Sequence, residues 1–227
     1  MGYGVRCKVF GEYACFSNPV FKVERVSYDI ITASAAKGIL DCIYYKPAIK
    51  WHIDKIHVIK PIKFTNIRRN EVSETAKLSA VNQVMKNPKP YYILSTEARH
   101  QRAALILRDV EYVIEAHFEL TEKAGETDTV EKHYSVAMRR LRKGQFFQKP
   151  FLGTREFGCS FELIENSEDI PVSCMSGEKD LGFMLYCMNY QTDEKKEKQW
   201  VEPTFIRAVL QNGILDFTKI EESGIIR

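Results

Sequence analysis

The feature that most constrains the fold of this chain is the order in which two hydrophobic periods follow one another. Residues 5–10 alternate apolar and polar side chains, which predicts a strand. Apolar residues then recur at helical spacing from Thr32, a residue type that caps helices, to about Tyr44. Residues 49–59 alternate again, with a change of parity that predicts a β-bulge near Asp54. The first part of the chain therefore predicts a strand, a helix and a strand.

The second part continues with the same two periods. Residues 110–120 predict a long strand, and the polar turn after them leads to a predicted capping box of Asp128 and Glu131. The helix that follows is expected to end at Gly144, and a strand is predicted at residues 159–164. The main elements are therefore ordered β-α-β-β-α-β, which is typical of an α+β fold of the ferredoxin-like or RRM-like type.

Two segments lie outside this order. Residues 72–98 predict an insertion between the two middle strands, with a short helix near 73–85. The end of the chain predicts a small antiparallel sheet, in which Asn212-Gly213 forms a type I′ turn. Its predicted strands are 181–190, 205–210 and 214–217. We expect a ferredoxin-like domain over residues 1–170 and an appended sheet over residues 171–227.

Composition excludes several classes of protein. The chain has 227 residues, of which 44% are hydrophobic and 28% charged, as in ordinary globular proteins. The longest run without charged or strongly polar residues, 181–188, is far shorter than the ~20 residues of a membrane-spanning helix, so no membrane partner is expected. The first sixteen residues mix charge into the first apolar stretch, so no signal peptide is expected. The six cysteines form no C-x-x-C pair, which favours reduced thiols and a cytoplasmic location.

We expect neither a metal nor another cofactor. His52 and His57 are five residues apart, and no histidines are arranged as H-E-x-x-H. The chain also has no G-x-G-x-x-G or Walker-type loop, which argues against a small-molecule enzyme. A small-molecule enzyme stays an open possibility, because a fold alone does not exclude it.

Charge is distributed unevenly, although the net charge is only +3. Residues 46–69 contain seven basic residues and one acid, and residues 129–155 likewise carry a local balance of +6. Acidic residues gather elsewhere, notably at 162–169. Such clustering fits a surface that binds a polyanion. A basic helix face that is merely solvated is the alternative.

Two groups of ionisable residues are candidates for chemistry. Lys132 and His133 fall where the second helix is predicted to begin, near unpaired amide groups that favour an anion. Histidine can accept a proton near pH 7, although a surface histidine without a special role is the alternative. Tyr44 and Tyr45 end the first helix, and one is expected to pack in the core while the other presents its hydroxyl group. The spacing of the residues does not show which of the two tyrosines packs in the core.

Three motifs carry a resemblance to a known family. They are S-Y-x-x-x-x-A-x-x-x-K-G-I at residues 27–39, I-Y-Y-K-P at 43–47 and F-L-G-T-R-E at 151–156. In this order they resemble the CRISPR-associated Cas5 family, subtype I-C. The resemblance extends from Val5 to the hairpin at Asn212-Gly213.

The resemblance implies an endoribonuclease that cuts CRISPR precursor RNA at its repeat hairpin and stays with the mature guide RNA among the other subunits of the type I-C interference complex. The family's catalytic residues fall on Tyr44, Lys132 and His133. Their chemistry fits metal-free cleavage that leaves a 2′,3′-cyclic phosphate. In this reaction His133 acts as the base or acid, Lys132 supplies a cation, and the hydroxyl group of Tyr44 orients or protonates. A non-catalytic subunit that holds the 5′ handle of the guide RNA is the alternative.

RNA recognition is expected to depend on shape and charge, because the major groove of an A-form stem is too narrow for side chains. Phe146 and Phe147 could stack on a base or anchor their loop in the core. The predicted RNA-binding residues are Lys46, Arg139, Arg140, Arg142, Lys143, Gly144 and Arg155.

Overall fold

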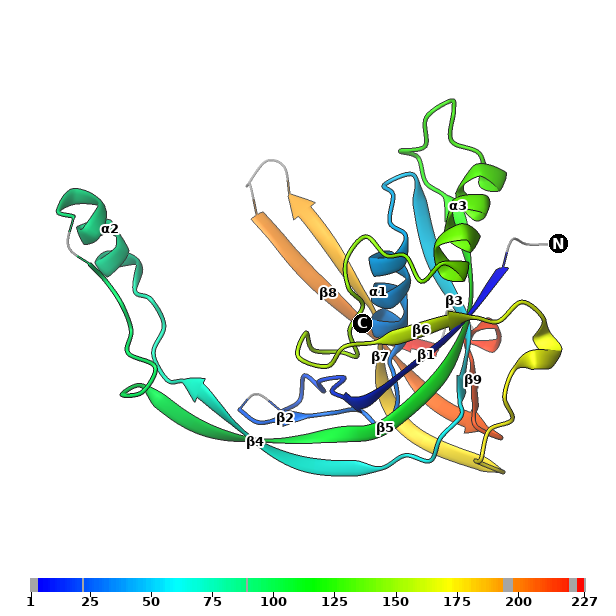
Figure 1. Cartoon of the computed structure of the whole chain (residues 1–227), viewed down its shortest axis with the longest axis horizontal. Helices are drawn as coiled ribbons and strands as arrows, with labels where there is room; N and C mark the ends of the chain where they lie inside the picture. The colour runs from blue at the N-terminus through cyan, green and yellow to red at the C-terminus, as the bar shows by residue number, and fades with distance from the viewer. Residues whose placement is uncertain (1–3, 22, 89, 194–197, 221–223, 227) are drawn as a thin grey trace.

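A computed structural model describes residues 4–21, 23–88, 90–193, 198–220 and 224–226. Its ten strands form one sheet, and three α-helices lie beside it in the described residues (Figure 1). None of these helices is long and apolar enough to cross a membrane. The helices are α1 (Ala33–Ile43), α2 (Leu78–Lys86) and α3 (Val130–Arg142). The strands are β1 (Gly4–Ala14), β2 (Arg25–Val26), β3 (Ile49–Val58), β4 (Phe64–Val72), β5 (Arg99–Leu120), β6 (Ser160–Leu163), β7 (Glu178–Asp193), β8 (Lys198–Gln211), β9 (Ile214–Asp216) and β10 (Ile225–Ile226).

The central strands of the sheet position the site. They lie in the order β3-β5-β1-β6, and each neighbouring pair is antiparallel. Helix α1 precedes β3 and helix α3 precedes β6, and Figure 1 shows both helices on the same side of the sheet. The hydrophobic core lies between these helices and the sheet. A mixed fold with a large antiparallel sheet is thus confirmed, whereas the ferredoxin-like topology stays a prediction.

The local signals around α1 are confirmed. Thr32 is the N-cap, and its Oγ1 accepts the backbone N–H of Ala35 at 3.1 Å. The register of β3 against β5 shifts between Ile53 and Lys55, where the change of parity predicts a bulge. Because of this shift, Trp51 before the bulge and residues after it both reach the core.

The start of α3 differs by one residue from the prediction. Thr129 is the N-cap, and its Oγ1 accepts the backbone N–H of Lys132 at 3.2 Å. Asp128 was wrongly predicted as the cap, because aspartate and threonine both cap helices and the path of the turn decides which oxygen reaches the helix. Asp128 Oδ2 instead accepts the N–H of Gly125 at 3.0 Å. The other carboxylate oxygen, Oδ1, is available for a contact with His133.

The arm, defined as β4, residues 99–108 of β5 and α2, projects from the rest of the molecule (Figure 1). Strands β4 and β5 pair from Phe64 opposite Leu107 to Val72 opposite Arg99. Strand β4 was not predicted, and β5 begins well before residue 110, because the alternating side chains of β4 are half-buried or exposed and give no strong apolar period. The helix at the tip begins at Leu78 rather than near residue 73.

The carboxy-terminal strands continue the main sheet and do not form a separate one as expected. Strand β9 pairs with β3 from Lys55 opposite Asp216 to His57 opposite Ile214, because β3 has an edge that β5 does not use. Asn212 and Gly213 have φ angles of 50° and 77°, as a type I′ turn requires. That turn is confirmed, and the division at residue 170 stays a prediction.

Candidate active site

The end of α1 meets the beginning of α3 at a short hydrogen bond. Tyr44 Oη lies 2.6 Å from His133 Nδ1, although the two residues are 89 positions apart in the sequence. Both are buried, with exposed fractions of 3% for Tyr44 and 1% for His133. Tyr45 is 55% exposed, so Tyr44 is the tyrosine that faces inward. His133 is therefore not a surface histidine.

Asp128 holds the other side of the imidazole ring. Its Oδ1 lies 3.1 Å from His133 Nε2. The N–H of Gly125, followed by the charges of Lys132 and His133, lowers the pKa of Asp128, so the carboxylate is ionised and accepts a hydrogen bond from the Nε2–H group of His133. In a neutral ring Nδ1 is then the acceptor, and the Tyr44 hydroxyl donates to it. Sequence reasoning missed Asp128 as a site residue and named it only as a cap.

Tyr44 is buried, and contacts from Trp51 and Arg140 hold it in place. Burial raises the pKa of its phenol, so the hydroxyl group keeps its proton at neutral pH. Trp51 Nε1 donates to the Tyr44 carbonyl at 3.0 Å. Arg140 Nη1 donates to the carbonyl of Ile43 at 2.7 Å, and its guanidinium carbon lies 5.2 Å from the centre of the Tyr44 ring. Arg140, a predicted RNA contact, thus holds the end of α1.

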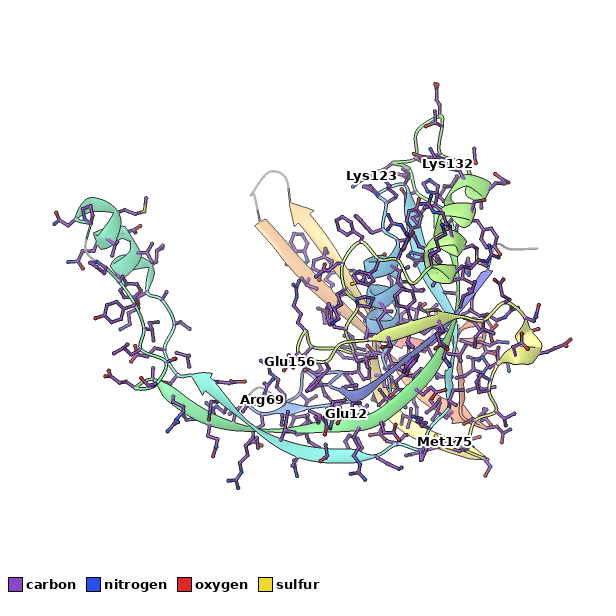
Figure 2. The ribbon with its side chains drawn as sticks, viewed as in Figure 1. Glu12, Arg69, Lys123, Lys132, Glu156 and Met175 are labelled. Atoms are coloured by element: carbon purple, nitrogen blue, oxygen red, sulfur yellow. The ribbon has the colours of Figure 1, made fainter. Side chains whose placement is uncertain are left out.

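Lys132 provides the exposed cation of the site. Its Nζ donates to the carbonyl of Thr127 at 3.0 Å and lies 3.5 Å from Asp128 Oδ1. The side chain is 53% exposed, and Figure 2 shows Lys132 at the start of α3, at the outer end of that helix. The structure therefore brings together the three predicted catalytic residues, and of these Lys132 alone faces the solvent.

The other predicted RNA-binding residues fall into two groups. Arg142 makes two hydrogen bonds with Glu165, at 2.7 Å and 3.1 Å, and the Arg155 guanidinium lies 5.8 Å from the ring of Phe151. The second group is Lys46, Arg139, Lys143 and Gly144, which are exposed, as Arg142 and Arg155 also are. The second group is available to a polyanion, whereas Arg142 already has a carboxylate partner.

The glycine-containing loop after α3 attaches to the end of α1. The backbone N–H groups of Phe147 and Gln148 both donate to the carbonyl of Cys42, at 2.9 Å and 3.0 Å. Phe147 is 77% exposed, so its ring does not anchor the loop in the core. A Cβ atom on Gly153 would lie 2.0 Å from the carbonyl oxygen of Cys15, so only glycine fits there. In the described residues, no group of three or more His, Cys, Asp or Glu could hold a metal ion.

Comparison with known proteins identifies the family to which this chain belongs. The model of a family described as CRISPR-associated protein (Cas_Cas5) matches residues 4–218, so the chain belongs to the CRISPR-associated Cas5 family. It is 45% identical over 221 residues to a protein of Mannheimia succiniciproducens named CRISPR pre-crRNA endoribonuclease Cas5d, with 95% of each chain covered.

A second relative and a solved structure agree with this family. A protein of the same name from Thermus thermophilus is 39% identical over 189 residues, which cover 83% of this chain and 75% of the relative. A solved structure titled "Crystal Structure of CRISPR-associated Protein" superimposes with a TM-score of 0.68 at 26% identity, covering 99% of this chain and 96% of the other. The predicted membership of the Cas5 family is confirmed.

Proposed function

We propose that this chain is an endoribonuclease that cuts CRISPR precursor RNA at the repeat hairpin without a metal and leaves a 2′,3′-cyclic phosphate. The observation that carries the proposal is the hydrogen-bonded series Asp128, His133 and Tyr44, with the Lys132 ammonium group beside it. The names of the two curated relatives, both CRISPR pre-crRNA endoribonuclease Cas5d, support the substrate class. The strand order β3-β5-β1-β6 supports a ferredoxin-like topology.

The reaction requires two proton transfers. The 2′-oxygen attacks phosphorus, the bond from phosphorus to the 5′-oxygen breaks, the 2′-hydroxyl proton leaves and the 5′-oxygen gains a proton. The Tyr44 hydroxyl group is hydrogen-bonded to His133 Nδ1, so the histidine cannot take the 2′-hydroxyl proton directly. That proton passes to Tyr44 Oη as Tyr44 gives its own proton to His133. Asp128 stabilises the imidazolium ion that results.

Lys132 and the turn before α3 complete the proposed mechanism. The ammonium group of Lys132 stabilises charge on the phosphorane and on the departing 5′-oxygen, which takes its proton from solvent water. Since Tyr44 and His133 are buried in the free protein, RNA reaches them only when part of their surroundings moves. The exposed residues Arg139 and Lys143 then contact phosphates of the stem, and the product stays bound as guide RNA beside the other subunits of the interference complex.

The test is cleavage of an end-labelled repeat hairpin in EDTA, with analysis of the product ends. Wild type is expected to make one cut that ends in a cyclic phosphate, and His133→Ala and Lys132→Ala to lose at least about 100-fold in rate without losing RNA binding. Lys219→Ala is the control, because Lys219 is an exposed lysine distant in sequence from the site. Undiminished cleavage by His133→Ala overturns the assignment. Tight binding without cleavage by wild type favours the alternative, a subunit that only holds guide RNA.

A further inference from the structure

A cavity lies beside the site, between the beginning of α1, the edge of β3 and strands β7 and β8. Its volume is about 490 Å³, within the range of roughly 300–1,000 Å³ for small-molecule pockets. None of Tyr44, Asp128, Lys132 and His133 lines it. Its lining includes Lys37, Lys50, Trp51, Tyr186, Asn189 and Glu202.

One side of this cavity is cationic. Lys37 comes from the first turns of α1 and Lys50 from β3. Lys37 lies 3.7 Å from Asp41, whereas Lys50 has no ion pair within the described part of the chain. His52, on the same strand, has its Nε2 buried without a hydrogen bond to any described residue, although Glu119 Oε2 lies 3.4 Å away. These groups suit an anion with further hydrogen-bonding atoms.

The opposite side of the cavity offers acceptors and aromatic surface. Strands β7 and β8 contribute the amide of Asn189, the carboxylate of Glu202 and the hydroxyl group of Thr204, which is buried. Trp51 and Tyr186 supply aromatic walls. A carboxylate is the group that commonly accepts hydrogen bonds from ribose hydroxyls, and an amide can pair with a base edge. Phosphate, ribose and base therefore each have a matching part of the wall.

We propose that this cavity binds one unpaired ribonucleotide of the RNA substrate, next to the cleavage site. The inference rests on the proposed function. Lys37 and Lys50 contact the phosphate, Glu202 the ribose hydroxyls, and Asn189 the base. Lys50 also lines another cavity, of about 440 Å³, with Pro47 and residues 119–123.

Trp51 connects the cavity with the catalytic pair. One part of Trp51 lines the cavity, and its Nε1 donates to the Tyr44 carbonyl at 3.0 Å. The Trp51 ring also packs edge-on against Phe118, at 5.2 Å between ring centres, and Phe118 packs against His133 at 6.4 Å. A nucleotide in the cavity would therefore contact the residue whose indole N–H group holds the Tyr44 carbonyl, which couples occupancy of the cavity to the position of Tyr44.

The test uses two cysteines of the full-length protein. Cys187 lines the cavity, whereas Cys174 is exposed and does not line it. At a concentration ten times the Kd of repeat RNA that carries its single-stranded flank, Cys187 should be alkylated about tenfold more slowly and Cys174 at its original rate, as mass spectrometry of the labelled peptides measures. An unchanged Cys187 rate overturns the proposal, and if the same sample cleaves the hairpin, the proposed function stands.

Two further measurements identify the source of the nucleotide and the role of Lys50. Cytidine or adenosine monophosphate that protects Cys187 at micromolar concentration would mean that the cavity takes a free nucleotide, which would overturn the assignment to the RNA strand. Lys50→Gln should raise about tenfold the RNA concentration that half-protects Cys187, the effect of losing one charged contact of roughly 1.4 kcal/mol. Lys55→Gln, on the same strand and outside this cavity, should not. Equal effects of the two variants would contradict a nucleotide held by Lys50.

Discussion

The two ends of strand β5 have opposite surroundings. At the carboxy-terminal end, Phe118 lies in the core against Trp51 and His133, and Tyr44 completes a closed group of aromatic side chains. At the amino-terminal end, β5 pairs with β4, and the helix at the tip of this arm has no buried residue. Met85 of that helix is 79% exposed. The same strand therefore belongs to a packed body and to a projecting ladder.

This difference shows how each region obtains its structure. The packed end depends on contacts between residues far apart in sequence, such as the hydrogen bond between Tyr44 and His133. The arm depends on hydrogen bonds between neighbouring strands and on ion pairs along β4, where Arg69 contacts both Glu71 and Glu156. Figure 2 shows Arg69 and Glu156 pointing toward each other there. We expect substitutions at the packed end to change chemistry and changes in the arm to leave it unaltered.

The largest effect is expected from removal of one hydroxyl group at the packed end. Tyr44→Phe keeps the buried ring but removes the donor to His133 Nδ1, so cleavage of the repeat hairpin should fall about 100-fold. Single-turnover cleavage rates measure the loss. Tyr45→Phe is the matched control, because Tyr45 is exposed, and its rate should equal that of wild type. Equal losses in both variants would mean that the closed pair is not the reacting one.

Two neighbouring arginines on α3 should separate chemistry from binding. Arg140 donates to the Ile43 carbonyl and stacks on Tyr44, so Arg140→Lys should lower the single-turnover rate about tenfold, as for one lost hydrogen bond of roughly 1.4 kcal/mol. Arg139→Ala should keep that rate and reduce the salt dependence of RNA affinity by about one phosphate contact. Filter-binding titrations at several salt concentrations measure the second effect. The reverse pattern would place Arg140 on the RNA surface.

A pH-dependent effect should distinguish Asp128 from an ordinary surface carboxylate. The pKa of Asp128 is lowered in the folded protein, so its contribution to stability is present above the unfolded value of about 3.9 and disappears as pH falls through the lower folded value. Asp128→Asn should therefore unfold at lower urea concentration than wild type at pH 7. Below about pH 4 the two midpoints should converge. A constant difference across this range would show that the charge of Asp128 does not stabilise the fold.

The smallest effect is expected from removal of the tip of the arm. The Ser73 N–H donates to the Ala98 carbonyl at 2.8 Å, so a two-residue Asn-Gly turn can replace residues 74–97. Since α2 buries no residue, the melting temperature should change by less than about 3 °C, which corresponds to under 1 kcal/mol in a chain of this size. Differential scanning calorimetry measures it. A large drop would show that the tip packs on the body.

Sequence patterns predicted the features that depend on near neighbours. The cap at Thr32, the bulge before Lys55 and the turn at Asn212-Gly213 each depend on a few consecutive residues, and each is present. The family resemblance selected Tyr44, Lys132 and His133, and the structure brings them together. Their catalytic roles stay predictions.

The features that sequence did not predict depend on distant contacts. Asp128 faces His133 because the turn at residues 125–128 uses only one of its carboxylate oxygens. Arg140 belongs to a run of basic residues that suggests RNA binding, and only the approach of α1 to α3 turns it toward Ile43. Strand β4 has no continuous apolar side because one face of the arm is left without a covering layer.

The arm also sets a rule for how homologous chains can change in length. Its two strands are paired residue by residue, so an insertion must enter both of them to keep the pairing. Adding two residues to each strand would lengthen the arm by about 7 Å and return every side chain to its original face. Adding one residue to each strand near the body would move every side chain farther along the arm, such as Ile67 and Arg69, to the opposite face. Lengths among relatives should therefore differ in steps of two residues per strand, a pattern that an alignment can count.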